Sequence, residues 1–359
     1  MPRKSVAIIG AGLMGTAIAA AHLRRGVPVL LYDSSADALE NAPRRIAGEL
    51  QLQGAGGDVR AVRCSIDLAE AARLPVIIET ITEKLKAKQK LYRKLQAAAA
   101  DGFVPFLFSN TSTISISTLA TELGGGWRKN FCGFHFFHPV RERSLVEIVS
   151  GAETAATTIG VARQHAERIA KQLILVKDGP GFLVNRMLNP YLTGALQLLA
   201  EGVEMERIER VAVGFGMKMG PFRIMDEIGL DVVLHAGWVL FKAFPDRVPR
   251  SPLLLKLVEL GRLGRKTGRG FMLYPSATSW DGNGFPDPEL PSLLEVGTPL
   301  PISDTEIIER LIRGMADEAL RCLDDGIITD PADADLASVD ALGFPEKHGG
   351  ILQWAEPSR

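Results

Sequence analysis

Short apolar runs alternate with amphipathic stretches over the first half of the chain. Residues 5–9 (SVAII) and 27–32 (VPVLLY) are aliphatic and lie next to glycine, which is typical of buried strands. Residues 13–25 and 83–100 show helical spacing instead. This alternation predicts an α/β domain of the Rossmann type, with a mostly parallel sheet and helices on both faces. The other strand candidates are residues 61–64, 75–79, 104–108, 131–137, 145–149 and 173–176.

The pattern changes after the sequence DGPG at residues 178–181, which is a strong turn signal. Beyond it the spacing is helical, apart from a polar, Pro- and Gly-rich stretch at 274–301 that we interpret as a linker. We therefore predict one α/β domain over residues 1–180 and two all-α domains over 181–285 and 286–359. The expected helices span residues 182–200, 204–213, 221–244, 252–260, 304–323 and 331–339.

The helical part contains a weak internal repeat. Residues 189–202 (NPYLTGALQLLAEG) are echoed 124 positions later by residues 313–326 (RGMADEALRCLDDG). Each copy is followed by another helix and then by a Gly-Phe pair, which ends at Phe215 in the first copy and at Phe344 in the second. Two segments with similar buried faces can pack as a pseudo-symmetric pair, so we predict a duplicated helical repeat.

Composition and charge exclude several classes of protein. The 359 residues include 41 Lys and Arg against 42 Asp and Glu, a balance that argues against a nucleic-acid-binding protein or a polybasic membrane anchor. No apolar run approaches the roughly 18–20 residues that span a bilayer. The three cysteines, Cys64, Cys132 and Cys322, are far apart, so we expect neither a disulfide framework nor a metal site. Such cysteine usage suits a reducing compartment, and we predict a cytoplasmic protein.

A nucleotide-binding signature follows the first predicted strand. The sequence GAGLMG matches G-x-G-x-x-G between a strand and a helix. Gly10 would permit the tight turn, Gly12 the approach of a pyrophosphate and Gly15 close packing of the helix. Because the free N–H groups at the start of a helix favour phosphate, we expect Gly10, Gly12, Leu13, Met14 and Gly15 to bind a dinucleotide. A tight turn without a ligand is the plain alternative.

Asp33 lies at the end of the second predicted strand, 18 residues after Gly15. A carboxylate at this place accepts hydrogen bonds from the adenosine ribose and repels a 2′-phosphate. Ser34 and Ser35, which come next, offer no arginine to such a phosphate. We therefore predict NAD rather than NADP, with FAD less favoured. The alternative for Asp33 is a helix N-cap.

Two histidines, His135 and His138, lie in the apolar sequence FHFFHP. A dehydrogenase that transfers hydride needs a base for the hydroxyl proton, and imidazole titrates near neutral pH. Glu147 lies in the next apolar run, where an unpaired charge would be costly, so we predict that it pairs with and orients His135. A buried core histidine is the plain alternative, and a metal site at the two histidines lacks a third ligand.

Seven motifs follow one another along the chain: IIGAGLMGTAIA near the start, ETITEKLKAK (79–88), FSNTSTISI (108–116), GFHFFHPVRERSLVEIV (133–149), KDGPGFLVNRML (177–188), GPFRIMDEIGLD (220–231) and GRKTGRGFMLY (264–274). In these motifs the chain resembles the L-3-hydroxyacyl-CoA dehydrogenases of fatty-acid β-oxidation. Residues 303–354 resemble the second helical domain in the dehydrogenase half of the multifunctional β-oxidation enzymes. The hydratase/isomerase half does not precede them, so we expect a stand-alone dehydrogenase module.

The resemblance implies NAD-dependent, reversible oxidation of an L-3-hydroxyacyl-CoA to a 3-oxoacyl-CoA, with the thioester in a cleft between the α/β and helical domains. It implies His135 as the general base and Glu147 as the carboxylate that orients it. It places Ser112 at the 3-oxygen of the substrate and Asn185 near the thioester or 3-keto group. Taken alone, Ser112 could cap a turn and Asn185 a helix.

The resemblance also places Glu83 and Lys88 beside the nicotinamide ribose and Asn110 near the cofactor. Glu83 and Lys88 could instead belong to a solvated helix face. The implied partners are an acyl-CoA substrate and other β-oxidation enzymes, such as a hydratase or a thiolase.

Three features depart from the family pattern. His138 stands where the family commonly has Asn, and when protonated it would oppose a positive charge on His135. The helical hairpin that carries a CoA-binding lysine in the small enzymes is shortened, which leaves Arg44 and Arg45 as candidate phosphate contacts. The second helical repeat could replace a partner subunit, which gives either a monomer with an internal pseudo-dimer or a homodimer.

Two other functions stay open on the sequence alone. One is a dehydrogenase of the same fold that acts on a non-CoA hydroxy acid, such as a sugar acid or carnitine. The other is a nucleotide-binding protein that has lost catalysis, with His138 as the mark of that loss. Turnover of 3-oxoacyl-CoA by NADH separates the expected enzyme from both.

Overall fold

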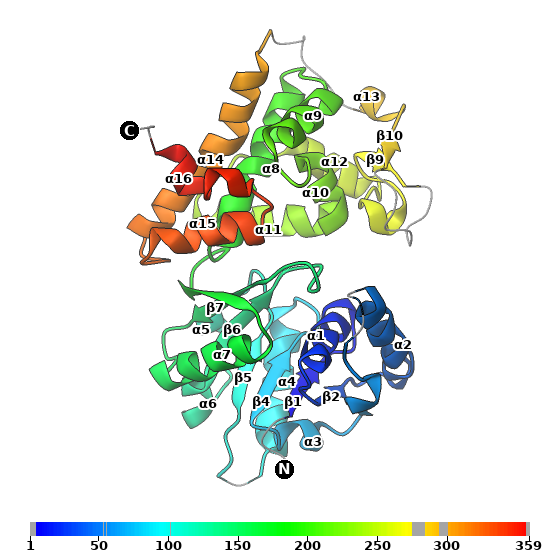
Figure 1. Cartoon of the computed structure of the whole chain (residues 1–359), viewed down its shortest axis with the longest axis vertical. Coiled ribbons are helices and arrows are strands. Elements are labelled where there is room, and N and C mark those ends of the chain that lie inside the picture. Colours follow the sequence, from blue (N-terminus) through cyan, green and yellow to red (C-terminus); the bar gives the residue numbers. More distant parts are fainter. Residues whose placement is uncertain are drawn as a thin grey trace. The chain divides into compact units, whose positions relative to one another are not determined.

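The computed structural model of the protein describes residues 5–52, 54, 56–100, 102–274, 284–293 and 301–356. The chain forms two compact units, Met1–Phe182 and Leu183–Arg359, which we call the sheet unit and the helical unit (Figure 1). The predicted division of the helical part between residues 285 and 286 stays a prediction. Much of the predicted linker at 274–301 lies outside the described residues, and the rest of it includes a short strand and a short helix, β10 (Phe285–Pro286) and α13 (Leu290–Leu293).

The sheet unit is built on one eight-stranded sheet in the order β3-β2-β1-β4-β5-β6-β7-β8. The first six strands follow the order of a dinucleotide-binding fold, with the reversal between β1 and β4. The four residues of β1 are all buried, as expected for a central strand covered on both faces. The strands are β1 (Val6–Ile9), β2 (Val29–Tyr32), β3 (Val62–Ser65), β4 (Val76–Glu79), β5 (Phe106–Ser109), β6 (Phe131–Phe136), β7 (Leu145–Ser150) and β8 (Gln172–Lys177).

Helices cover both faces of this sheet, as predicted. Phe108 and Ser109 are neighbours on β5 and therefore point to opposite faces. The Phe108 ring lies 6.1 Å from the ring of His165 on α7, whereas Ser109 and Tyr92 of α4 both donate to the Glu79 carboxylate. The helices are α1 (Leu13–Arg24), α2 (Ala36–Leu52), α3 (Leu68–Ala72), α4 (Leu85–Ala98), α5 (Ile116–Ala120), α6 (Gly125–Lys129) and α7 (Ala156–Arg168).

One strand pair departs from the parallel arrangement. β6 and β7 pair antiparallel, whereas the other neighbouring strands of the sheet pair in parallel. The connection between them, residues 137–144, is too short for the crossover that a parallel pair requires. The antiparallel register sets His135 directly opposite Glu147, so the two side chains lie on the same face of the sheet.

The helical unit follows the predicted helices closely except at one point. The helix expected over 221–244 is divided in two at Gly229, which has a φ of +99°. A Cβ at Gly229 would lie 2.8 Å from the Lys266 amine, which is the end of a flexible side chain, so it is the backbone conformation that requires glycine. The helices are α8 (Val184–Ala200), α9 (Met205–Phe215), α10 (Pro221–Ile228), α11 (Leu230–Ala243), α12 (Pro252–Glu259), α14 (Asp304–Asp324), α15 (Pro331–Asp340) and α16 (Ile351–Ala355).

The predicted repeat is visible as a pseudo-two-fold pairing of α8 with α14. Residues 124 apart in sequence occupy equivalent places, and a residue on a two-fold axis contacts its own equivalent. Pro190 and Gly314 are such a pair, because a Cβ on Gly314 would lie 3.0 Å from the Pro190 Cβ. The rings of Phe215 and Phe344, which end the two Gly-Phe pairs, also meet at 5.8 Å.

Two ion pairs of the helical unit obey the same symmetry. Arg186 binds Asp325 at 2.8 Å, and Arg310 binds Glu201 at 2.5 Å. Arg310 is the repeat equivalent of Arg186, and Asp325 is the equivalent of Glu201, so one contact occurs twice. The duplicated helical repeat is therefore confirmed at the level of individual contacts.

Over residues 5–52, 56–100, 102–274, 284–293 and 301–356, no helix combines the length and apolar character that crossing a bilayer demands. In the same ranges, no three His, Cys, Asp or Glu side chains are grouped so as to hold a metal ion.

Candidate active site

The predicted pair of His135 and Glu147 is present in the sheet unit. His135 Nδ1 lies 2.7 Å from Glu147 Oε2, and both side chains are buried. The antiparallel register of β6 and β7 produces this contact, because cross-strand partners point to the same face. A carboxylate on one ring nitrogen fixes the imidazole tautomer and stabilises the imidazolium form.

The His135 ring lies in an aromatic surround. Phe137 is 4.5 Å away between ring centroids and Phe182 is 6.2 Å away. Because Nδ1 faces Glu147, Nε2 is the nitrogen that can meet a substrate. Burial, reinforced by Arg141, holds the pKa of His138 below its ordinary value, so His138 is neutral near pH 7. The expected opposition between two charged histidines therefore does not arise at neutral pH.

The glycine loop after β1 has the geometry of a dinucleotide cradle. Gly10 has a φ of +106°, and a Cβ at Gly15 would lie only 1.8 Å from the Gly10 carbonyl oxygen. A Cβ at Gly12 would meet no atom within 4 Å, so the surface above Gly12 is open to a ligand. No side chain caps α1 at Gly12, which leaves its first N–H groups, including those of Leu13 and Met14, for phosphate oxygens. These observations fit the predicted cofactor.

Asp33 ties the end of β2 to this loop. Its Oδ2 accepts the Ala11 N–H at 2.7 Å and its Oδ1 accepts the Ser35 N–H at 2.9 Å. The carboxylate is partly exposed, so free lone pairs remain for ribose hydroxyls. Ser35 accepts the Ala38 N–H at the start of α2, so Ser35, and not Asp33, caps that helix.

Of the two arginines considered for CoA phosphates, Arg45 donates to the Ala11 carbonyl oxygen at 2.9 Å, which places its guanidinium at the glycine loop. Arg44 is exposed on the same helix, α2. Phosphate binding by either arginine stays a prediction.

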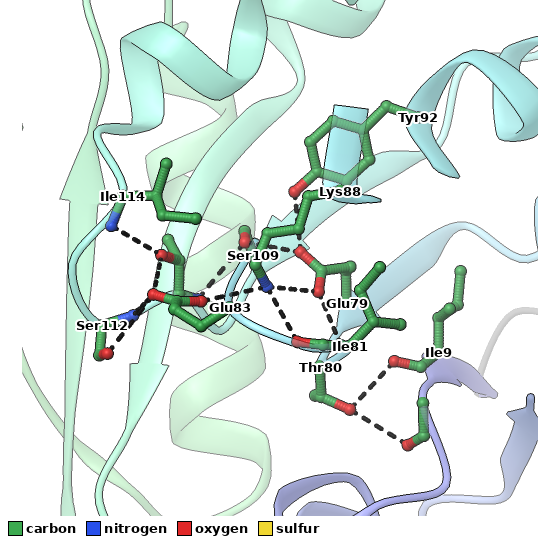
Figure 2. Close-up of polar contacts among 12 residues, drawn as sticks. Ile9, Glu79, Thr80, Ile81, Glu83, Lys88, Tyr92, Ser109, Ser112 and Ile114 are labelled. Carbon is green, nitrogen blue, oxygen red and sulfur yellow. Dashed lines mark hydrogen bonds and ion pairs between the residues drawn. The ribbon is translucent and has the colours of Figure 1, made fainter. Parts of the chain in front are cut away.

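Glu83 fixes the loop that contains Ser112 (Figure 2). Its Oε1 accepts the Thr111 hydroxyl at 2.5 Å and the N–H groups of Ser112 and Thr113 at 2.8 and 3.0 Å. Burial opposes ionisation of Glu83, but Lys88 and these donors outweigh it and hold the pKa of Glu83 below its ordinary value. Glu83 is therefore a charged anchor for the predicted substrate loop.

Lys88 lies deeper than its predicted place beside the cofactor. Only 1% of its side chain is exposed, and its amine binds Glu79 Oε1 at 2.6 Å and Glu83 Oε2 at 3.4 Å. The alternative of a solvated helix face is thus wrong for Lys88. A direct contact between Lys88 and the cofactor stays a prediction. In the structure the buried Lys88 amine contacts the Glu83 carboxylate.

The remaining site residues hold or flank the reactive strand. Asn110 accepts the Phe136 N–H through Oδ1 at 2.9 Å, next to His135. It therefore fixes the strand that carries the histidine, and contact with the cofactor stays a prediction. Asn185 lies in the first turn of α8, in the helical unit, and its role toward the substrate also stays a prediction.

Sequence reasoning missed Glu79 and Thr80. Glu79 ends an apolar strand and is fully buried, and the Thr80 hydroxyl lies 3.0 and 3.1 Å from the carbonyl oxygens of Ile9 and Gly10. The signal for Glu79 was present, since it is an acid at the end of an apolar run, just as Glu147 is an acid within one.

Comparison with protein families identifies both units. Residues 5–179 match the NAD binding domain of 3-hydroxyacyl-CoA dehydrogenase, and residues 181–274 match its C-terminal domain. The chain belongs to the 3-hydroxyacyl-CoA dehydrogenase family. The sheet unit is therefore the NAD-binding part of a dehydrogenase, in agreement with its strand order and glycine loop.

Solved structures of this family cover three quarters of the chain or more. A 3-hydroxybutyryl-CoA dehydrogenase from Escherichia coli is 26% identical, with a TM-score of 0.83 over 99% of this chain and 91% of that one. An (S)-3-hydroxybutyryl-CoA dehydrogenase from Ralstonia eutropha is 31% identical, with a TM-score of 0.70 over 76% and 99%. The dehydrogenase part of multifunctional enzyme 1 from C. elegans is 25% identical, with a TM-score of 0.65 over 96% and 79%.

Proposed function

We propose that this dehydrogenase catalyses the reversible oxidation of an L-3-hydroxyacyl-CoA to a 3-oxoacyl-CoA. NAD⁺, when bound, supplies the acceptor for the hydride that leaves C3. The buried contact between His135 and Glu147 supports this proposal most directly, because it is the arrangement that accepts a hydroxyl proton at neutral pH.

His135 takes the proton of the 3-hydroxyl group on Nε2 and returns it in the reverse direction. Glu147 keeps the Nδ1 proton in place and stabilises the imidazolium that forms. Ser112 orients the 3-oxygen from a loop that Glu83 holds rigid, and Asn185 contacts the thioester end. The cofactor is held by the loop of Gly10, Gly12 and Gly15 and by Asp33. The proposed catalytic residues are His135, Glu147, Ser112 and Asn185. The proposed cofactor-binding residues are Gly10, Gly12, Leu13, Met14, Gly15, Asp33, Glu83, Lys88 and Asn110.

The wider setting is also part of the proposal. The substrate chemistry suits fatty-acid β-oxidation or related acyl-CoA metabolism in the cytoplasm, where a hydratase would supply the hydroxyacyl-CoA and a thiolase would consume the oxoacyl-CoA. The pairing of α8 with α14 within one chain supports a monomer with an internal pseudo-dimer over a homodimer through the same face.

The decisive assay follows NADH oxidation with acetoacetyl-CoA and with 3-oxoacyl-CoAs of graded chain length. We expect turnover with at least one of them, and no turnover with keto acids that lack CoA. Turnover of the CoA-free acids alone would show that the substrate is a free hydroxy acid and not an acyl-CoA. Binding of NADH without turnover of any of these compounds would remove the catalytic proposal altogether.

A further inference from the structure

A buried charge cluster lies at the carboxyl ends of β4 and β5 (Figure 2). Its centre is the fully buried carboxylate of Glu79, the last residue of β4. Each oxygen of this carboxylate accepts two donors, at 2.6 to 2.8 Å. The donors are the Lys88 amine and the Ile81 N–H on Oε1, and the Tyr92 and Ser109 hydroxyls on Oε2.

Within this cluster one cation serves two carboxylates. The Lys88 amine lies 2.6 Å from Glu79 but 3.4 Å from Glu83, so Glu79 is the closer partner of the lysine. Glu83 is ionised, as its lowered pKa shows, and burial keeps the pKa of Tyr92 well above its ordinary value, so the phenol is neutral. Glu79, Lys88 and Glu83 together therefore carry one net negative charge.

The fold indicates which half of the dinucleotide meets this charge. Asp33 and the glycine loop, at the ends of β2 and β1, form the adenosine and pyrophosphate side. The second mononucleotide half of such a sheet is built on β4 to β6, and it receives the nicotinamide half. Lys84, which precedes α4, and Lys86 in its first turn are exposed, so water and salt screen their charges.

We propose that Glu79 is a positioning residue that draws Lys88 away from Glu83 and so leaves a net negative charge on the nicotinamide side of the site. Oxidised nicotinamide is a cation and reduced nicotinamide is neutral, so this charge favours binding of NAD⁺ relative to NADH. The inference rests on the proposed function, because it requires that the site bind both cofactor forms.

The test compares the affinities for NAD⁺ and NADH, measured by calorimetry without any substrate. Glu79→Gln keeps the shape of the side chain and removes one negative charge. We expect this substitution to weaken the affinity for NAD⁺ relative to the affinity for NADH by roughly three- to tenfold. This is the effect of one unit charge that acts over several ångströms in a partly buried site. If Glu79 had a purely structural role, the substitution would weaken the affinities for both cofactor forms by the same factor.

Tyr92→Phe is the matched control. It removes one hydrogen bond to the same carboxylate and leaves every charge in place, so the ratio of the two affinities should not change even if the melting temperature falls. An equal loss of both affinities in Glu79→Gln, or a changed ratio in Tyr92→Phe, would overturn the inference.

A second variant keeps the test informative if Glu79→Gln does not fold. Glu83→Gln removes the other carboxylate of the cluster, and the charge count then predicts a change of the ratio in the same direction. An unchanged ratio in that variant would also overturn the inference. Failure of the unaltered protein to bind either form would instead reject the proposed function.

Discussion

Buried charged side chains have different roles in the two units of the protein. In the sheet unit, Glu79 at the end of β4 and Glu147 within β7 are fully buried, and each holds a side chain of the candidate active site. In the helical unit, Arg186, Glu209 and Asp226 are buried as well, but none of these three side chains has a role in the proposed chemistry. Glu209 accepts the N–H groups at the start of α10, and Asp226 accepts two N–H groups of the chain before β9 (Met272–Leu273) and within it.

This difference teaches that burial of a charge does not by itself mark an active site. A buried acid must have a partner because an unpaired charge is costly in an apolar interior. What separates the two units is the partner. Glu147 binds a titratable imidazole, whereas Glu209 binds backbone N–H groups, which do not titrate near neutral pH. Substitutions in the two units should therefore separate loss of chemistry from loss of fold.

The largest effect is expected at the imidazole. His135→Ala removes the general base, and we expect kcat to fall by about 10³- to 10⁴-fold with NAD affinity nearly unchanged. Steady-state kinetics and cofactor titration on the same preparation measure both. Near-normal turnover would exclude His135 from the mechanism.

A large effect on stability, without an effect on chemistry, is expected at Arg186. Arg186→Met leaves Glu318 and Asp325 without their buried cation, which should cost about 3 kcal/mol of unfolding free energy. The repeat equivalent, Arg310→Met, is the matched control, since its ion pair is about one-third exposed and should cost about 1 kcal/mol or less. Denaturant unfolding measures both. Equal losses of unfolding free energy in the two variants would contradict the difference in burial between the two ion pairs.

A smaller catalytic effect is expected for Glu147→Gln. The amide keeps the volume of the side chain but cannot stabilise the imidazolium, so kcat should fall roughly 100-fold with little change in melting temperature. The pH profile of kcat should also shift, because the histidine loses its anionic partner. If kcat were unchanged, Glu147 would be a structural acid like Glu209.

The two units should respond to acid in opposite directions. Burial lowers the pKa of His22 to about 4 and also lowers that of His165, so the unfolded sheet unit binds more protons below about pH 6.5 and its stability falls on acidification. Burial raises the pKa of Glu209 to about 7 and that of Asp226 to about 6, so the folded helical unit binds more protons and its stability rises as pH falls from about 7.

Backbone hydrogen exchange, corrected for intrinsic rates, reports this response for each unit separately. Between about pH 7 and pH 5 we expect a loss on the order of 2 kcal/mol in the sheet unit and a gain of similar size in the helical unit. Glu209→Gln is the control that should reduce the gain. A loss of protection in both units would contradict the assignment.

The sequence was sufficient to predict most elements and the His135–Glu147 pair. The apolar pattern marks β1 because all its residues are buried, and it marks α8 because that helix buries a regular face. The same spacing continues through Gly229, so it gives no sign of the break between α10 and α11, which depends on the positive φ of Gly229.

Contacts between a helix and the sheet were harder to predict. Lys88 looks like a surface residue in sequence because its burial depends on Glu79, which lies on a neighbouring element. The spacing of residues along one helix carries no information about such a partner. Sequence patterns therefore predicted the buried contact of His135 with Glu147 but not the buried contact of Lys88 with Glu79.

The pairing of α8 with α14 has a consequence for how this chain can change. In a symmetric dimer, any substitution at the interface enters both halves at once. Here each half is encoded separately, so the two arginines of the duplicated ion pair can differ, and one is 1% exposed while its counterpart is 34% exposed. A substitution on one side of the shared interface therefore leaves the other side unchanged.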